Sequence, residues 1–163
     1  MDETEFRNAY KELNPNRCIF EKAITNRRCD CARKRKFVLA TRECVACQSE
    51  TSLERCTSVL NAIRDNSRFS LKVVTIDGPM PHNKELQVQA GGMLALQNIF
   101  SDEAETDGLQ DQLKTAEQQT VINIDQTMEQ ALNRYTAIDM LPYGEIVKGI
   151  VKYQSRPKRN KNK

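Results

Sequence analysis

The crowding of cysteines into one part of the chain most constrains what this sequence can fold into. All six cysteines of the 163 residues lie between Cys18 and Cys56, spaced C-x10-C-x-C-x12-C-x2-C-x8-C. A chain of this length can bury a hydrophobic core without covalent cross-links. The cysteines are therefore not needed to hold a very small fold together. The pattern indicates either metal chemistry or cysteines that serve singly as small buried hydrophobic residues.

The start of the chain indicates the compartment and hence the state of the thiols. The segment MDETEFRNAYKEL is acidic and lacks the apolar run of a secretory signal. No stretch approaches the roughly 20 apolar residues of a membrane span. We therefore expect a cytoplasmic protein, in which thiols are kept reduced. Cysteine clusters in that compartment more often bind metal or take part in redox chemistry than form permanent disulfides.

The spacing bears on which metal centre the thiols would bind. Thiolates are soft ligands that select zinc, copper(I) or iron–sulfur clusters. Structural zinc sites usually present paired C-x2–4-C elements, and only Cys44 and Cys47 fit that spacing, whereas Cys29 and Cys31 form a C-x-C pair. The ferredoxin run C-x2-C-x2-C-x3-C is also missing. Ligands from separate segments favour a [4Fe–4S] cluster inside a helical domain, with zinc as the alternative.

Four ligands suffice for either centre, so two cysteines are spare. Taking one cysteine from each segment selects four ligands, which are Cys18, Cys31, Cys47 and Cys56. Cys29 and Cys44 are then reserve ligands. The spare pair could serve in redox exchange, in cluster transfer or in a regulatory disulfide.

Part of this pattern resembles a known family. The spacing Cys44-x2-Cys47-x8-Cys56, preceded by Cys29 or Cys31, is similar to that of the WhiB-like iron–sulfur regulators, which are small, helical, basic proteins. The resemblance is confined to residues 29–56. The long last gap and the lack of a glycine-rich turn with an aromatic residue after the cysteines depart from the family pattern. The function of that family is therefore not carried over to this chain.

Charge is distributed unevenly along the chain. Arg17–Arg42 contains nine basic and two acidic residues, Ser101–Glu129 eight acidic residues and one lysine, and Lys152–Lys163 six basic residues and no acid. The basic and acidic regions could attract each other within the fold, and nearby cations would also favour thiolates. Dense basic residues are alternatively candidates for contacts with an anion or with nucleic acid. These candidates are Arg33, Lys34, Arg35, Lys36, Arg156, Lys158 and Arg159.

Hydrophobic periodicity predicts an all-α fold. We expect a single compact multi-helix domain over residues 1–154, with an N-terminal cysteine-rich metal-binding half, a helical remainder over 84–154 and a disordered basic tail over 155–163. A capping box at Thr51 and Glu54 predicts one helix start, and Gly91-Gly92 predicts close helix packing or a kink. The expected helices are Glu3–Leu13, Cys18–Asn26, Phe37–Cys47, Thr51 to about Phe69, Lys84–Phe100, Leu109–Tyr135 and a last one beginning at Pro142.

The sequence contains no pattern typical of catalysis. His82 is the only histidine, in an expected loop, and no glycine-rich phosphate-binding motif is present. We therefore expect a non-enzymatic cytoplasmic iron–sulfur protein that acts in electron transfer, redox sensing or maturation of a larger metalloenzyme. It would have a protein partner and no membrane contact. The alternatives are a zinc-stabilised nucleic-acid-binding regulator and an interaction protein with inert cysteines.

Overall fold

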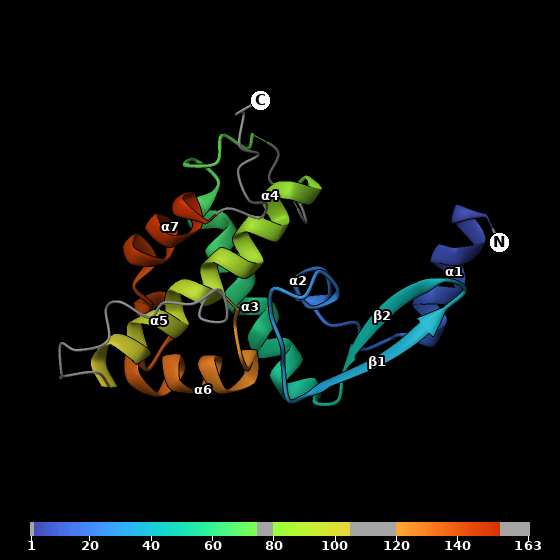
Figure 1. The fold of residues 1–163 in the computed structure, drawn as a ribbon, viewed down its shortest axis with the longest axis horizontal. Helices are drawn as coiled ribbons and strands as arrows, with labels where there is room; N and C mark the ends of the chain where they lie inside the picture. The colour runs from blue at the N-terminus through green and yellow to red at the C-terminus, as the bar shows by residue number, and fades with distance from the viewer. Residues whose placement is uncertain (1, 75–79, 105–119, 154–163) are drawn as a thin grey trace, which may run out of the picture.

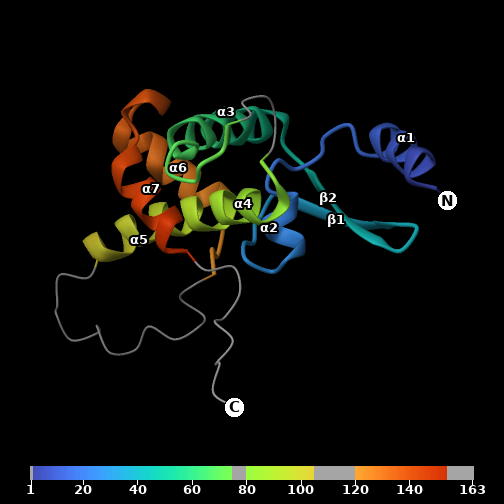
Figure 2. The ribbon, with the colours of Figure 1, turned by 90° about the horizontal axis from the view of Figure 1, so that it is seen from above.

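A helical body and a projecting arm make up the chain in the computed structural model, which describes residues 2–74, 80–104 and 120–153. Helices α3 to α7 pack together in the body, and the β1–β2 hairpin with α1 projects from it (Figures 1 and 2). The elements are α1 (Glu3–Leu13), α2 (Glu21–Thr25), β1 (Lys34–Leu39), β2 (Arg42–Cys47), α3 (Glu50–Ser67), α4 (His82–Leu86), the π-helical turn η1 (Gln87–Gly91), α5 (Gly92–Ala104), α6 (Ile124–Tyr135), the 3-10 turn η3 (Ile138–Met140) and α7 (Tyr143–Lys152). The predicted tail, 155–163, and residues 109–119 of a predicted helix lie outside the described residues.

The prediction of an all-α fold is wrong, because the predicted helix Phe37–Cys47 is part of an antiparallel hairpin. Strands β1 and β2 pair from Lys34 opposite Cys47 to Leu39 opposite Arg42. Ala40, in the two-residue turn, has a φ of 55°. That conformation is usually taken by glycine, asparagine or aspartate, so the sequence carries no hairpin signal there. The apolar residues of this short segment fit a helical period as well as a strand.

The predicted helix over Cys18–Asn26 is too long, and α2 begins only at Glu21. The backbone N–H of Cys18 donates instead to the carbonyl of Val45 at 3.0 Å. An isolated bridge between Arg17 and Ala46 continues this pairing. The segment before α2 is therefore tied to the outer edge of β2, which satisfies its backbone groups without a helical turn.

The predicted positions of two helices, α1 and α3, are confirmed. Helix α1 covers the predicted range, and the side chain of Asp2 caps it by accepting from the N–H of Glu5 at 2.8 Å. Helix α3 is present, but the predicted cap at Thr51 is wrong. Ser49 caps α3, and its Oγ accepts from the N–H of Ser52 at 3.2 Å. The last helix was predicted to begin at Pro142 and begins one residue later, at Tyr143.

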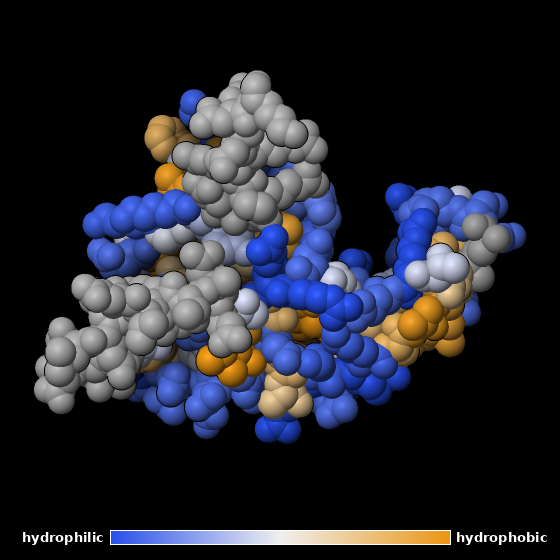
Figure 3. All heavy atoms as spheres, viewed as in Figure 1, coloured by the Kyte–Doolittle hydropathy of each residue, from blue (hydrophilic) through white to orange (hydrophobic). Residues whose placement is uncertain are grey.

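One hydrophobic cluster holds the helices from α2 through α7 together. Its members include Phe20 from the start of α2, Leu60 from α3, Met93 from α5, Met128 from α6 and Ile150 from α7, each at most 1% exposed. Hydrophilic side chains cover most of the surface seen in Figure 3, with small hydrophobic patches between them. None of the helices in the described part of the chain is long and apolar enough to cross a bilayer.

Close packing at the double glycine leads to a first testable prediction. A Cβ added at Gly91 would lie 2.9 Å from the Cβ of Tyr153 and 3.1 Å from the Cα of Ile150. We expect Gly91→Ala to lower the free energy of unfolding by about 1–3 kcal/mol, because these backbones must separate. Gly144→Ala is the matched control, because a Cβ there meets nothing within 4 Å. It should raise the free energy by up to about 1 kcal/mol. Urea titrations check both, and equal effects would refute the packing argument.

Candidate metal centre

Strand β2 brings the first and third candidate ligands together. The N–H of Cys18 bonds to the Val45 carbonyl at 3.0 Å, and the N–H of Cys47 bonds to the Asn16 carbonyl at 2.8 Å. Asn16–Cys18 therefore runs along the edge of β2 that β1 leaves open. Two cysteines far apart in sequence are in this way held on adjoining strands of backbone.

A loop that pairs with the chain entering α6 positions Cys31. The N–H of Asp30 donates to the Val121 carbonyl at 2.9 Å, and the N–H of Ile124 donates to the Asp30 carbonyl at 2.9 Å. Strand β1 begins three residues after Cys31, at Lys34, which lies opposite Cys47. The chain from Cys29 to Cys31 is a loop, and it places Cys31 between the hairpin and the start of α6.

Helix α3 supplies the fourth candidate ligand. It follows β2 almost directly, and Ser49, its cap, accepts a hydrogen bond from the thiol of Cys47 at 3.2 Å. Cys56 lies in the second turn of this helix and is 9% exposed. The short β2–α3 connection therefore fixes Cys56 relative to Cys47.

These contacts gather the thiols of four segments at one place. Every pair within the set is close enough for a charge on one sulfur to act on the other. We call this set the thiol quartet; its members are Cys18, Cys31, Cys47 and Cys56. They are the four cysteines that the sequence selects as ligands.

Hydrogen-bond donors point at the sulfurs of the quartet. The backbone N–H of Phe20 faces Cys18, and the N–H groups of Arg33 and Asp125 face Cys31. The Arg33 contact measures 3.4 Å from N to Sγ. Asp125 lies in the first turn of α6, where backbone N–H groups are left free by the helix. Such donors stabilise a thiolate more than a neutral thiol.

Burial is the main influence on the pKa values of three quartet thiols, those of Cys18, Cys31 and Cys56. It raises the pKa of Cys18 to about 12 and that of Cys56 to about 11, and the neighbouring cysteines raise both further. Burial also raises the pKa of Cys31. The raised pKa values keep the free thiols of Cys18, Cys31 and Cys56 protonated at neutral pH, and a bound metal centre would have to displace those protons. In the described residues, no three His, Cys, Asp or Glu side chains are arranged to hold a single metal ion.

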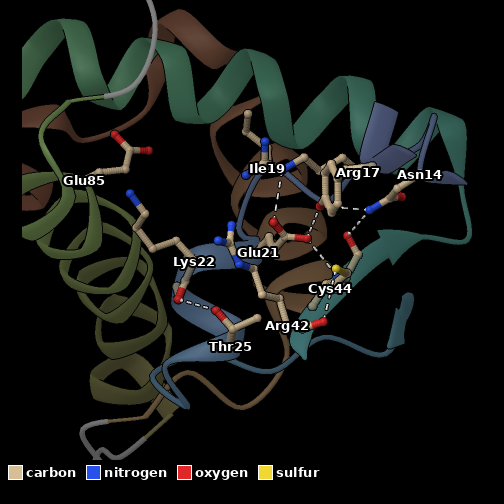
Figure 4. A network of polar contacts seen from close by, with 12 residues as sticks. Asn14, Arg17, Ile19, Glu21, Lys22, Thr25, Arg42, Cys44 and Glu85 are labelled. Carbon is tan, nitrogen blue, oxygen red and sulfur yellow. Dashed lines mark hydrogen bonds and ion pairs between the residues drawn. The ribbon is translucent and has the colours of Figure 1, made fainter. Parts of the chain in front are cut away.

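The two reserve cysteines occupy different surroundings. Cys29 is buried, and its thiol lies within electrostatic reach of Cys18 and Cys31. Cys44 lies on the arm, where its thiol faces the carbonyl of Arg42 at 3.5 Å and lines an open pocket between α1 and the hairpin (Figure 4). The charged groups that act on Cys44 include Glu21 and Arg17. Cys29 thus borders the quartet, whereas Cys44 belongs to another part of the fold.

A hydrogen-bond network around Glu21 fastens the arm to the site (Figure 4). The carboxylate of Glu21 accepts from the N–H of Val45 at 2.8 Å, from Arg17 Nε at 3.1 Å and from the hydroxyl of Tyr10. Asn14 Nδ2 donates to the same Tyr10 hydroxyl at 3.0 Å. Glu21 thus joins α1, the start of α2 and β2, next to the backbone that carries Cys18.

The basic run that sequence reasoning singled out is largely paired with acids of the same chain. Arg33 Nε lies 3.4 Å from Asp125, Lys34 pairs with Asp30, and Lys36 Nζ lies 2.9 Å from Glu43. The guanidinium of Arg35 lies over the ring of Phe37, 5.1 Å from its centroid. The other three candidates, Arg156, Lys158 and Arg159, lie outside the described residues. His82 is exposed at the start of α4, not in the predicted loop.

Sequence reasoning missed two residues at the site, Arg55 and Asp125. Arg55 hydrogen-bonds to Cys56 and counteracts the effect of burial on that thiol. Its Nη2 lies 2.6 Å from Asp125 Oδ1. The only sequence signal for Arg55 is its position next to the candidate ligand Cys56. Nothing in the sequence relates Asp125 to the cysteines, because that relation comes from the pairing of the chain before α6 with the Cys31 loop.

Comparisons of this chain with protein-family models, with curated proteins and with solved structures find no match. The resemblance of its cysteine spacing to the WhiB-like regulators therefore carries no functional argument.

Proposed function

We propose that this chain is a cytoplasmic, non-enzymatic iron–sulfur protein whose [4Fe–4S] cluster is bound by the thiol quartet. It would act in electron transfer, in redox sensing or in the maturation of a larger metalloenzyme, together with a protein partner. The observation that carries the proposal is the gathering of four thiols from four separate segments at one place.

The surroundings of the quartet fit such a centre. Four cysteine thiolates are the usual ligands of a [4Fe–4S] cluster, and hydrogen bonds to the sulfurs tune it. Backbone N–H groups of Phe20, Arg33 and Asp125 supply such bonds. Arg55 Nε is buried and has no nitrogen or oxygen partner in the described residues, next to Cys56. A sulfur-rich anionic centre would satisfy that donor. When bound, the cluster would supply one-electron transfer.

The origin of the four thiols in separate segments favours the cluster over zinc. Four thiolates that share one zinc ion at about 2.3 Å lie about 3.8 Å from one another. In a [4Fe–4S] cube each thiolate binds a different iron atom, so the sulfurs are spread more widely.

The alternative, a zinc-stabilised nucleic-acid-binding regulator, has less support. Phosphate contacts need cations that are available to the nucleic acid. Three of the four basic side chains from Arg33 to Lys36 pair with carboxylates of this chain. The described residues thus offer few of the cations that this function would use.

Metal analysis after anaerobic purification tests the proposal. Visible absorption, iron, acid-labile sulfide and zinc are measured on the purified chain and again after reconstitution with ferrous iron and sulfide. We expect a brown protein with equal iron and sulfide, in the amount that one [4Fe–4S] centre requires. A colourless protein with one zinc ion per chain would support the regulator instead. Failure to take up any metal would leave the thiols as core residues or a redox switch.

A further inference from the structure

An ion pair between α3 and α6 lies against the thiol quartet. Arg55 Nη2 lies 2.6 Å from Asp125 Oδ1, and the two side chains are 23% and 16% exposed. Ser52, one turn before Arg55, donates its hydroxyl to the same oxygen at 3.1 Å. Asp125 is therefore fixed by two groups of α3, and it holds the guanidinium against the helix that carries Cys56.

Both members of this pair also contact the quartet. The guanidinium of Arg55 hydrogen-bonds to Cys56, and the backbone N–H of Asp125 donates to Cys31. The pair therefore spans two of the four thiols. Arg33, by contrast, reaches Cys31 through its backbone N–H, and its guanidinium, 55% exposed, lies beside Asp125.

We propose that Arg55, held in place by Asp125, sets the reduction potential of the centre. This inference rests on the proposed function. A fixed cation beside a cluster stabilises the reduced form, which carries one more negative charge, and raises the potential. The effect is strongest for a cation that is partly buried, because solvent screens it less. Arg55 meets that condition, and the exposed guanidinium of Arg33 does not. Asp125 acts as a positioning residue.

Midpoint potentials of reconstituted variants test this inference. We expect Arg55→Met to shift the potential to more negative values and Arg55→Lys to shift it less. The control Lys36→Gln, which removes a cation paired with Glu43 on the hairpin, should leave it nearly unchanged. The shift caused by Arg55→Met should be smaller in an Asp125→Asn background, because the guanidinium is then no longer held beside Cys56. Circular dichroism and iron content of each variant are measured first. If Arg55→Met does not retain the cluster, the comparison with Lys36→Gln is made with Arg55→Lys.

The outcomes separate this inference from the proposed function. An unchanged potential in the Arg55 variants, or an equal shift in Lys36→Gln, would overturn the assignment to Arg55 while the cluster stands. An equal effect of Arg55→Met in both backgrounds would overturn the role of Asp125. A wild-type chain that takes up no iron and sulfide would overturn the proposed function and this inference together.

Discussion

Replacing one cysteine of the thiol quartet with alanine is expected to abolish the iron–sulfur centre. Each member comes from a different segment, and the described surroundings supply no other cysteine to replace Cys47 or Cys56. Three thiolates leave one iron of the cube without a protein ligand. We expect the visible absorption and the bound iron of each variant to fall to background after anaerobic purification. The melting temperature should fall as well, because metal binding and folding are coupled.

The two reserve cysteines provide matched controls for this series. Cys44→Ala should retain the iron and sulfide of the wild type, because Cys44 lies on the arm and no quartet thiol is among the groups acting on it. Cys29→Ala should also retain them, although Cys29 borders Cys18 and Cys31. Loss of the centre in Cys29→Ala, with retention in Cys31→Ala, would show that the ligand assignment is wrong at this pair.

A second large effect is expected at the buried ion pair between α3 and α4. Arg64 Nε lies 3.1 Å and 3.2 Å from the two carboxylate oxygens of Glu85, which is 1% exposed. Burial opposes ionisation of Glu85, but hydrogen bonds from Arg64 and Gln89 lower its pKa overall. Arg64→Met leaves that carboxylate buried without its cation. We expect the free energy of unfolding to fall by about 3–5 kcal/mol in urea titrations.

Two comparisons separate the charge effect from a loss of packing. Arg64→Met combined with Glu85→Met should be less destabilising than Arg64→Met alone, because no unpaired charge remains buried. Lys148→Met breaks an exposed pair with Glu145, with an N–O distance of 3.2 Å, and should cost less than about 1 kcal/mol. If Arg64→Met costs no more than Lys148→Met, the ion pair does not stabilise the fold as argued.

The Arg64–Glu85 pair is connected through Gln89 to the segment that follows Cys18. Gln89 Nε2 donates to Glu85 at 2.8 Å and to the carbonyl of Ile19 at 3.2 Å, while its Oε1 accepts from the N–H of Ala23 at 3.1 Å. The network thus runs from the ion pair to the backbone on either side of the start of α2. It holds the segment that follows Cys18 against the helical body.

The sequence predicted the helices whose signals are local. Helix α1 has its predicted bounds, and the last helix begins after Pro142. Capping residues, helical periodicity and proline act within a few residues, so they can be read without the rest of the fold. The close packing expected at Gly91-Gly92 is also present, between the π-helical turn and the last turn of α7.

The sequence misled where long-range pairing decides the backbone. Cys18 was expected in a helix, but its N–H bonds to Val45 across the fold. The hairpin was missed because Ala40 takes a positive φ without the residue type that usually indicates one. In both places the local pattern allowed more than one structure, and hydrogen bonds to a distant segment selected among them.

At the site, the sequence by itself determined that thiols are abundant, that they fall in four segments, and which four cysteines could be taken one from each. Their role as ligands stays a prediction. Only the tertiary structure brings these four thiols within electrostatic reach of one another and decides which charges lie beside them. Arg33 and Lys36 are paired with carboxylates, and Arg55 is the cation that hydrogen-bonds to Cys56. The physical reason is that charge acts over distances of a few ångströms. Those distances are set by the contacts of α3 and of the Cys31 loop with the start of α6.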